Sequence, residues 1–164
     1  TPRQFYVFGE SLLYPVYSSI YGFWDALYST FWLDGFLSSL ISKEYLPWNP
    51  TFMTGGALLS LLPSAALAIG VIATLKKGDG ALRQMLCFSV TSVILYLAAL
   101  FYLFLTVPIL STVKATYALG LTPCFALLAA AGFEVLTQWR LLRAAIYGLF
   151  ACWIVCTYAT YIVI

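Results

Sequence analysis

Two aspartates in an aromatic stretch and one distant lysine have the clearest potential for chemistry in this chain. Asp25 and Asp34 lie in the stretch from Tyr17 to Phe36 (YSSIYGFWDALYSTFWLDGF), and Lys114 stands alone between two apolar segments. The chain has no histidine, so a general base for group transfer would have to be Asp or Glu. A fixed cation at a helix N-terminus suits a phosphate or pyrophosphate group. These residue types could bind a phosphate or pyrophosphate head group and supply a carboxylate base.

Structural roles remain open for the same residues. A lone lysine where an apolar helix begins is also a common flanking cation, whose stem lies along the helix while its ammonium reaches water. Asp25, Asp34 and Glu10 could cap helices, pair with Arg3 or Lys43, or simply be solvated. The two aspartates are nine residues apart, so on one continuous helix they would point to opposite sides. We therefore expect that they do not share a proton or a metal ion.

Aromatic residues could complete a binding site. Tyr117 follows Lys114 by three residues and would share its face of a helix, where it adds a hydroxyl. Five aromatic residues are spaced by four, three, four and three, which predicts one stripe along a helix: Tyr17, Tyr21, Trp24, Tyr28 and Phe31. The stripe could be packing, or a platform for a lipid or sugar ligand with Asp25 on its flank. The candidate substrate-binding residues are therefore Trp24, Asp25, Asp34, Lys114 and Tyr117, and no catalytic residue is identified.

Composition makes the bilayer the solvent for much of this chain. Of its 164 residues, 63% are hydrophobic and 9% are charged, whereas globular domains have about one half and one quarter. The net charge of +2 is too small to indicate a nucleic-acid partner. The four cysteines lie in apolar runs without metal-ligand spacing. We therefore predict an integral membrane protein with no metal site and no cofactor, and nothing in the sequence supports a divalent metal.

Four apolar segments are long enough to cross a membrane as helices. We predict an all-α fold in which residues 52–164 form a four-helix transmembrane bundle, with spans at about 52–75, 84–107, 115–136 and 144–164. Residues 1–51 hold about half of the aromatic residues, but glycine, proline and charged residues interrupt every window before a span can form. Trp and Tyr favour the headgroup level, so this segment is predicted to form interfacial helices.

Small residues and prolines predict how the spans pack and bend. The first span carries small side chains that allow close helix contact at Gly55, Gly56, Ser60, Ser64, Ala68 and Gly70. We expect Pro63 to kink this span and Pro123 to kink the third, because a proline has no N–H to donate.

Basic residues orient the spans. The loops after the first and third spans carry five of them, which are Lys76, Lys77, Arg83, Arg140 and Arg143. The loop after the second span carries only Lys114. By the positive-inside rule, the two basic loops face the cytoplasm. Residues 1–51 and Lys114 then share the outer face, and any site would lie between them.

Three stretches resemble, in the same order, the C-terminal half of bacterial multi-spanning glycosyltransferases of the GT-C class. They are Ser19–Phe36, the Pro47-Trp48-Asn49 run before a span, and Val113–Pro123, where the tyrosine follows the lysine by three residues. The group they resemble is protein-mannosyltransferase-like and uses polyprenyl-phosphate sugars. Taken together, the stretches extend over most of the chain.

The resemblance implies transfer of a sugar from a polyprenyl-phosphate carrier to an acceptor on the outer face of a bacterial inner membrane, with the N-terminal segment periplasmic. It implies that Lys114 lies near the carrier phosphate and that Asp25 or Asp34 lines the external cavity. In that family the proposed catalytic carboxylate lies in the first external loop of the full protein, which is not among these residues. We therefore expect a fragment that is inactive without the remainder of its polypeptide. The alternative is a non-catalytic membrane subunit or a transporter fragment.

Overall fold

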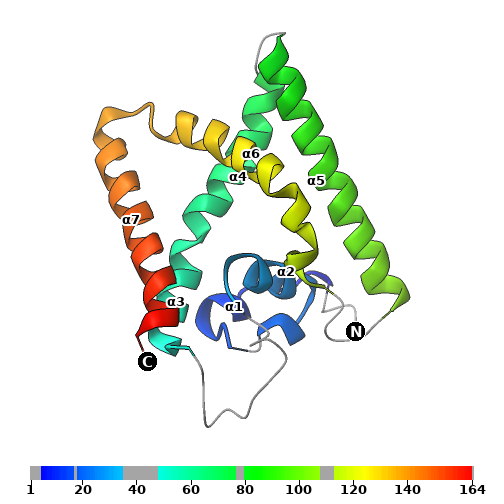
Figure 1. The fold of residues 1–164 in the computed structure, drawn as a ribbon, viewed down its shortest axis with the longest axis vertical. Helices are drawn as coiled ribbons and strands as arrows, with labels where there is room; N and C mark the ends of the chain where they lie inside the picture. Colours follow the sequence, from blue (N-terminus) through cyan, green and yellow to red (C-terminus); the bar gives the residue numbers. More distant parts are fainter. Residues whose placement is uncertain (1–4, 17, 35–47, 77–79, 108–112, 164) are drawn as a thin grey trace. The chain divides into compact units, whose positions relative to one another are not determined.

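The computed structural model describes residues 5–16, 18–34, 48–76, 80–107 and 113–163. Every regular element in these ranges is helical, and none is a strand (Figure 1). The elements are α1 (Glu10–Leu13), η2 (Ser18–Ile20), α2 (Phe23–Trp32), α3 (Pro50–Leu59), α4 (Leu61–Lys76), α5 (Ala81–Thr106), η4 (Ala115–Leu121), α6 (Thr122–Leu136) and α7 (Arg140–Ile162). The predicted all-α class is therefore confirmed for the described part of the chain.

Four helical stretches are long and apolar enough to cross a membrane, as predicted: Pro50–Lys76, Ala81–Thr106, Ala115–Leu136 and Arg140–Ile162. The shortest has 22 residues, roughly 33 Å of α-helix against about 30 Å of hydrocarbon. The second and fourth stretches begin before Arg83 and Arg143, the charged residues after which the predicted spans started. Long basic side chains reach water from a helix end, so the backbone there stays helical.

The first span has a well-defined start at α3. The side chain of Asn49 accepts hydrogen bonds from the N–H groups of Thr51 and Phe52 at 3.1 and 3.3 Å, and Pro50 follows at the first helical position. The first backbone N–H groups of a helix have no partner within it. An asparagine cap accepts hydrogen bonds from them, and a proline at the first position removes one of them. The backbone N–H of Asn49 also donates to the carbonyl oxygen of Thr160 at 3.0 Å, which ties this start to α7.

The first span is interrupted at Ser60, between α3 and α4, which agrees with the expected kink at Pro63. Pro63 cannot donate to the carbonyl of Leu59, so the helix loses one hydrogen bond at this point. The hydroxyl of Tyr28 lies 2.7 Å from both the carbonyl oxygen of Ala57 and Oγ of Ser60. The Tyr28 hydroxyl therefore donates a hydrogen bond to a backbone carbonyl at the break. Such a partner is needed where no water can reach the backbone.

Replacing Tyr28 by phenylalanine is expected to lower the free energy of unfolding by about 1 kcal/mol, because the contacts of its hydroxyl with Ala57 and Ser60 at the break are lost. The exposed Tyr102 in α5 supplies the matched control, and Tyr102→Phe should change stability by less than about 0.5 kcal/mol. Titration with SDS in detergent micelles, followed by circular dichroism, measures both values. Equal losses in the two variants would show that the Tyr28 hydroxyl does not stabilise the break.

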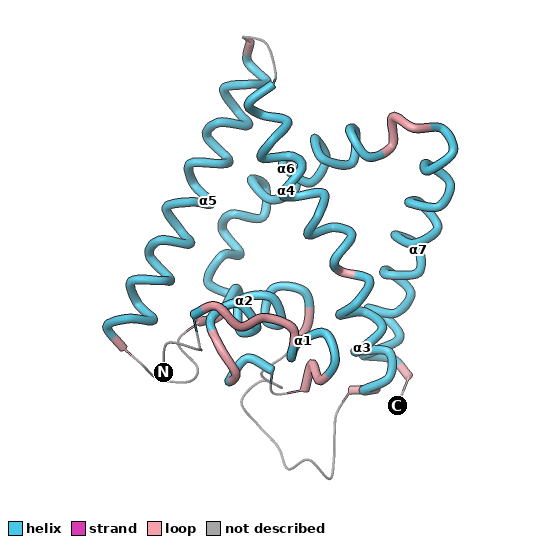
Figure 2. Tube along the Cα trace, turned by 180° about the vertical axis from the view of Figure 1, so that it is seen from behind, coloured by secondary structure: helices cyan, strands magenta, loops and turns pink. Residues whose placement is uncertain are grey.

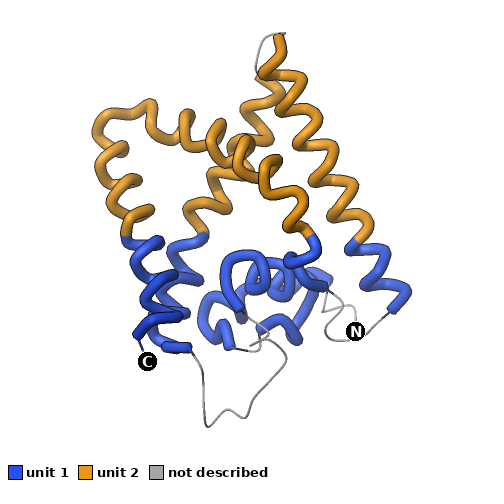
Figure 3. The backbone as a smooth tube through the Cα atoms, viewed as in Figure 1, with its two compact units in different colours: residues 1–60, 100–117, 152–164 blue, residues 61–99, 118–151 orange. Residues whose placement is uncertain are grey.

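The chain divides into two compact units (Figure 3). Unit 1 holds residues 1–60, 100–117 and 152–164, and unit 2 holds residues 61–99 and 118–151. Unit 1 thus combines the N-terminal segment with the start of the first span, the end of the second, the start of the third and the end of the fourth.

Unit 2 is held by a close crossing of α4 and α6 (Figure 1). A Cβ atom built on Gly70 would overlap the backbone of Leu128, and one built on Gly132 would overlap the backbone of Ala66. Small residues that allow such backbone contact are typical of helix pairs in membranes. The prediction of close contact at Gly70 is therefore confirmed, whereas its partner position Ala66 was not among the residues predicted.

The N-terminal segment of unit 1 consists of short helices joined by loops (Figure 2). Leu33, Met53 and Ala57 form a buried apolar cluster between this segment and α3. The predicted aromatic stripe is wrong in extent, because α2 begins only at Phe23 and Tyr21 lies in the turn before it. Tyr17, the first member of the predicted stripe, lies outside the described residues.

Candidate functional site

Helix α2 lies among the ends of the four candidate spans within unit 1. It contacts each of them through a different side chain: Tyr28 with Ala57 and Ser60, Phe23 with Phe101 and Phe104, Thr30 with Ala115, and Trp32 with Trp153. Ser60 follows the first residue of α3 by ten positions, and Trp153 precedes the last residue of α7 by nine, which are roughly 15 and 14 Å along a helix. The aromatic stretch is therefore inserted between helices.

Lys114 is brought to α2 by a long-range hydrogen bond. The backbone N–H of Ala115 donates to Oγ1 of Thr30 at 2.9 Å, across 85 residues of sequence. The same hydroxyl donates to the carbonyl of Ala26 at 2.7 Å, which fixes its direction. Lys114 precedes Ala115 directly and is partly buried. This contact joins α2 to the backbone of the residue after Lys114.

Tyr117 lies one 3₁₀ turn beyond Lys114. Its N–H donates to the carbonyl oxygen of Lys114 at 3.2 Å, and residues three apart in a 3₁₀-helix lie above one another. The ring of Tyr117 is 63% exposed, so its hydroxyl is accessible from outside the protein. Lys114 and Tyr117 are therefore one 3₁₀ turn apart, where an α-helical turn was expected.

Asp25 lies in the first turn of α2 and is completely buried. Its Oδ1 accepts three hydrogen bonds, from the N–H of Gly9 at 3.1 Å, the N–H of Ser11 at 2.9 Å and Oγ of Ser11 at 2.7 Å. Its Oδ2 is also buried and has no hydrogen-bond partner among the described residues. The carboxylate is therefore directed into the protein and toward α1, and not along the flank of an exposed aromatic surface.

Asp34 lies at the other end of α2. The helix ends at Trp32, and Leu33 is extended, so Asp34 is two residues past the helix. It interacts electrostatically with Tyr161 near the end of α7, and the ring of Tyr161 packs edge-on against Trp48 at 4.7 Å. The two aspartates therefore have separate surroundings at opposite ends of α2, and the helix ends before it reaches Asp34.

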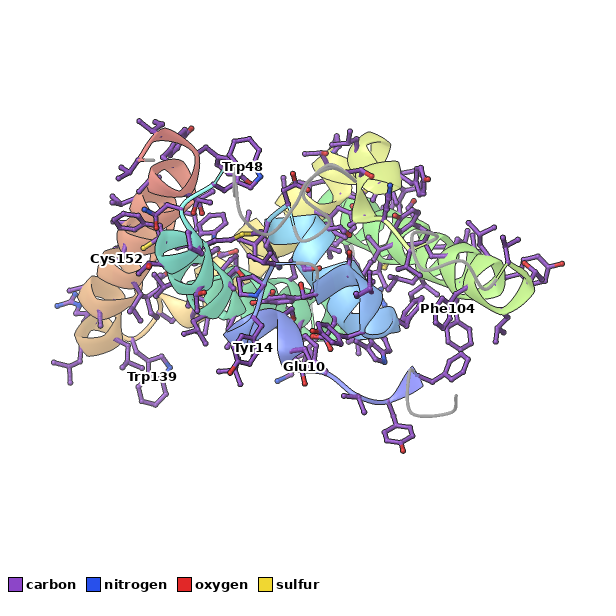
Figure 4. The ribbon with its side chains drawn as sticks, turned by 90° about the horizontal axis from the view of Figure 1, so that it is seen from below. Glu10, Tyr14, Trp48, Phe104, Trp139 and Cys152 are labelled. Carbon is purple, nitrogen blue, oxygen red and sulfur yellow. The ribbon has the colours of Figure 1, made fainter. Side chains whose placement is uncertain are left out.

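Trp24 is partly exposed and belongs to an aromatic cluster at the start of α2. Its Nε1 donates to the carbonyl oxygen of Phe5 at 2.9 Å, which holds the chain before α1 against α2. Phe5 contacts the rings of Phe101 and Phe104 at 5.9 and 5.3 Å (Figure 4, where Phe104 is labelled). The exposed edge of Trp24 can therefore contact an apolar chain or a sugar ring, while its polar atom is already satisfied.

Lys114 and Tyr117 thus offer an ammonium group and a phenol on the segment that Thr30 contacts, and Trp24 offers an exposed aromatic surface at the start of α2. Such a set suits an anionic head group on an apolar chain. Among the described residues, no three Cys, Asp or Glu side chains are grouped as a metal site would require. Two contributors, Ser11 and Thr30, were not predicted, because a lone hydroxyl residue in an aromatic segment carries no signal in the sequence.

Comparison with protein-family models, with curated proteins and with solved structures finds no match to this chain.

Proposed function

We propose that this chain is part of a GT-C-class membrane glycosyltransferase that transfers a sugar from a polyprenyl-phosphate carrier to an acceptor. The observation that carries the proposal is the hydrogen bond from Ala115 to Thr30, which holds Lys114 beside the aromatic helix α2. A cation next to an aromatic surface, where a helix enters an apolar layer, suits a lipid phosphate. This bond joins two of the three stretches that carry the family resemblance, Ser19–Phe36 and Val113–Pro123.

Each candidate residue has a role in this proposal. Lys114 pairs with the carrier phosphate, and the hydroxyl of Tyr117 donates to the same group. Trp24 and Asp34 line the path by which the acceptor approaches, and Asp25 belongs to the same N-terminal segment. Transfer makes a bond from the acceptor oxygen to the anomeric carbon, breaks the carbon–oxygen bond to the phosphate and releases polyprenyl phosphate. The base that takes the acceptor proton belongs to the remainder of the polypeptide.

The same proposal includes a location and an orientation. Five basic residues in the first and third loops against Lys114 in the second favour a cytoplasmic position for the basic loops. The N-terminal segment and Lys114 then lie at the periplasmic side of a bacterial inner membrane. We place the segment between the outer ends of the spans, because α2 contacts the first and fourth spans well inside their ends.

Lys114→Ala is expected to weaken binding of polyprenyl phosphate by about tenfold or more, because a charged hydrogen bond to the phosphate is lost. Lys114→Arg should keep most of the affinity, and Lys76→Ala, at the end of α4 in the other compact unit, should leave it unchanged. Native mass spectrometry of the purified full-length protein with added polyprenyl phosphate measures the affinity. Polyprenol, which has the same chain without the phosphate, should bind all variants equally.

Two results would contradict the proposal. If polyprenyl phosphate binds no better than polyprenol, the phosphate is not recognised. If membranes containing the full-length protein transfer no sugar from a panel of polyprenyl-phosphate hexoses, the chain is not part of such an enzyme. A stable complex with another membrane protein together with both negative results would favour the alternative, a non-catalytic subunit or a transporter fragment.

A further inference from the structure

Helix α1 is too short to be stable without an outside partner. It has four residues, Glu10–Leu13, and a single turn fixes several dihedral angles for one internal hydrogen bond. Its N-cap residue, Gly9, has no side chain to accept from the first backbone donors, and its φ of 136° is one that favours glycine. The donors at the start of α1 therefore need an acceptor from another part of the chain.

Asp25 supplies that acceptor from fourteen residues away. Its Oδ1 accepts from the N–H groups of Gly9 and Ser11 and from the hydroxyl of Ser11, the arrangement that a capping side chain normally provides from within its own helix. Ser11 and Asp25 are both 0% exposed, so water does not replace these bonds. Figure 4 shows Glu10 and Tyr14, at the two ends of α1, along one edge of this segment.

Two further contacts lay the same segment along α2. The indole of Trp24 donates to the carbonyl of Phe5, and the ring of Phe8 packs edge-on against Tyr28 at 5.3 Å. Tyr28 in turn reaches the break in the first span at Ser60. Residues 5–13 are therefore attached to α2 at three levels, and Asp25 provides the only charged group among these three attachments.

We infer that Asp25 is a positioning residue, whose Oδ1 holds α1 on α2, the helix whose Thr30 contacts the residue after Lys114. It acts through Gly9 and Ser11 and does not itself touch the substrate or the reacting atoms. The part of this inference that concerns sugar transfer depends on the proposed function, whereas the part that concerns α1 does not.

The geometry separates the acceptor role of Asp25 from its charge. All three hydrogen bonds end on Oδ1, so the amide oxygen of an asparagine can accept every one of them. The amide nitrogen would take the place of Oδ2, which has no partner among the described residues. A neutral amide costs less to bury than a charged carboxylate, so Asp25→Asn should keep the fold. Asp25→Ala removes the acceptor altogether.

Hydrogen exchange of the full-length protein in micelles tests the part concerning α1. In Asp25→Ala, the backbone amides of Gly9 and Ser11 should exchange about ten- to a hundredfold faster than in the unmodified protein. In Asp25→Asn, their exchange should stay within about threefold of the unmodified value. Unchanged exchange in Asp25→Ala, or exchange in Asp25→Asn as fast as in Asp25→Ala, would overturn the inference. If Asp25→Ala does not fold, the amide exchange rates of Asp25→Asn are compared with those of Ser11→Ala. This comparison decides whether the hydrogen bonds to Oδ1 hold α1.

Sugar transfer by the same variants tests the positioning role. Asp25→Asn should retain transfer within about threefold and the same dependence on pH, since no proton on Asp25 is used. A protected and folded Asp25→Asn that loses transfer by about a hundredfold or more would assign chemistry to the carboxylate and overturn the inference. Absence of transfer and of phosphate-dependent binding in the unmodified protein would overturn the proposed function alone, because the exchange experiment does not depend on either.

Discussion

Replacing Gly132 by alanine is expected to destabilise the protein by about 3 kcal/mol, the upper end of what overpacking a close contact costs. A Cβ atom at this position would overlap the carbonyl oxygen of Ala66, which belongs to the backbone of α4 and cannot rotate away. The two helices would have to separate and lose the contacts around the crossing. Gly70→Ala should have a similar effect through Leu128, and the double variant should lose less than the sum, since both changes open one crossing.

Gly148 in α7 is the matched control, because a Cβ built there meets no atom within 4 Å. Alanine is the better helix former by about 1 kcal/mol, so Gly148→Ala should be neutral or stabilising. Gly132→Ala and Gly148→Ala are therefore expected to change stability in opposite directions, and SDS titration in micelles measures both changes. A Gly132→Ala variant as stable as the unmodified protein would show that α4 and α6 do not cross with their backbones in contact.

The four spans could be predicted from the sequence because their cause is local. A helix in a bilayer must satisfy its own backbone, so length and apolarity are enough to place it. The break in the first span was likewise predictable, since Pro63 removes a donor wherever the helix packs. The helix ends were less predictable. The sequence predicts spans that begin after Arg83 and Arg143, whereas the helices include both residues, because long basic side chains can reach water from a helix end.

The interior of the N-terminal segment could not be predicted, because its determinants lie far apart in the sequence. The burial of Asp25 depends on Ser11, fourteen residues earlier, and the position of Lys114 depends on Thr30, 85 residues before Ala115. The aromatic spacing did suggest a helix, but it could not reveal that the helix starts at Phe23. A periodic pattern reports which residues could share a face, and tertiary contacts decide how much of the pattern becomes helical.

Replacing Phe23 by alanine is expected to lower the free energy of unfolding by about 3 kcal/mol, the lower end of the range for a buried phenylalanine. The lower end applies because an apolar side chain loses less free energy on exposure to lipid than on exposure to water. Phe23 is 2% exposed. Its ring lies 5.3 Å from Phe101 and 5.6 Å from Phe104, both at the end of α5, and 5.1 Å from Trp24. The substitution therefore removes the contact by which α2 is held to the second span.

The control for Phe23 is Phe88, which lies on α5 with 69% of its surface exposed. Lipid contacts an exposed ring in the folded and unfolded states alike, so Phe88→Ala should cost less than about 0.5 kcal/mol. A double-mutant cycle of Phe23→Ala with Phe104→Ala should give a coupling of about 1 kcal/mol, since these two rings, tilted by 58°, attract beyond their buried area. Equal losses at Phe23 and Phe88, with no coupling to Phe104, would mean that Phe23 faces lipid. Helix α2 would then not be seated against the second span, and the site proposed beside it would lose its support on that side.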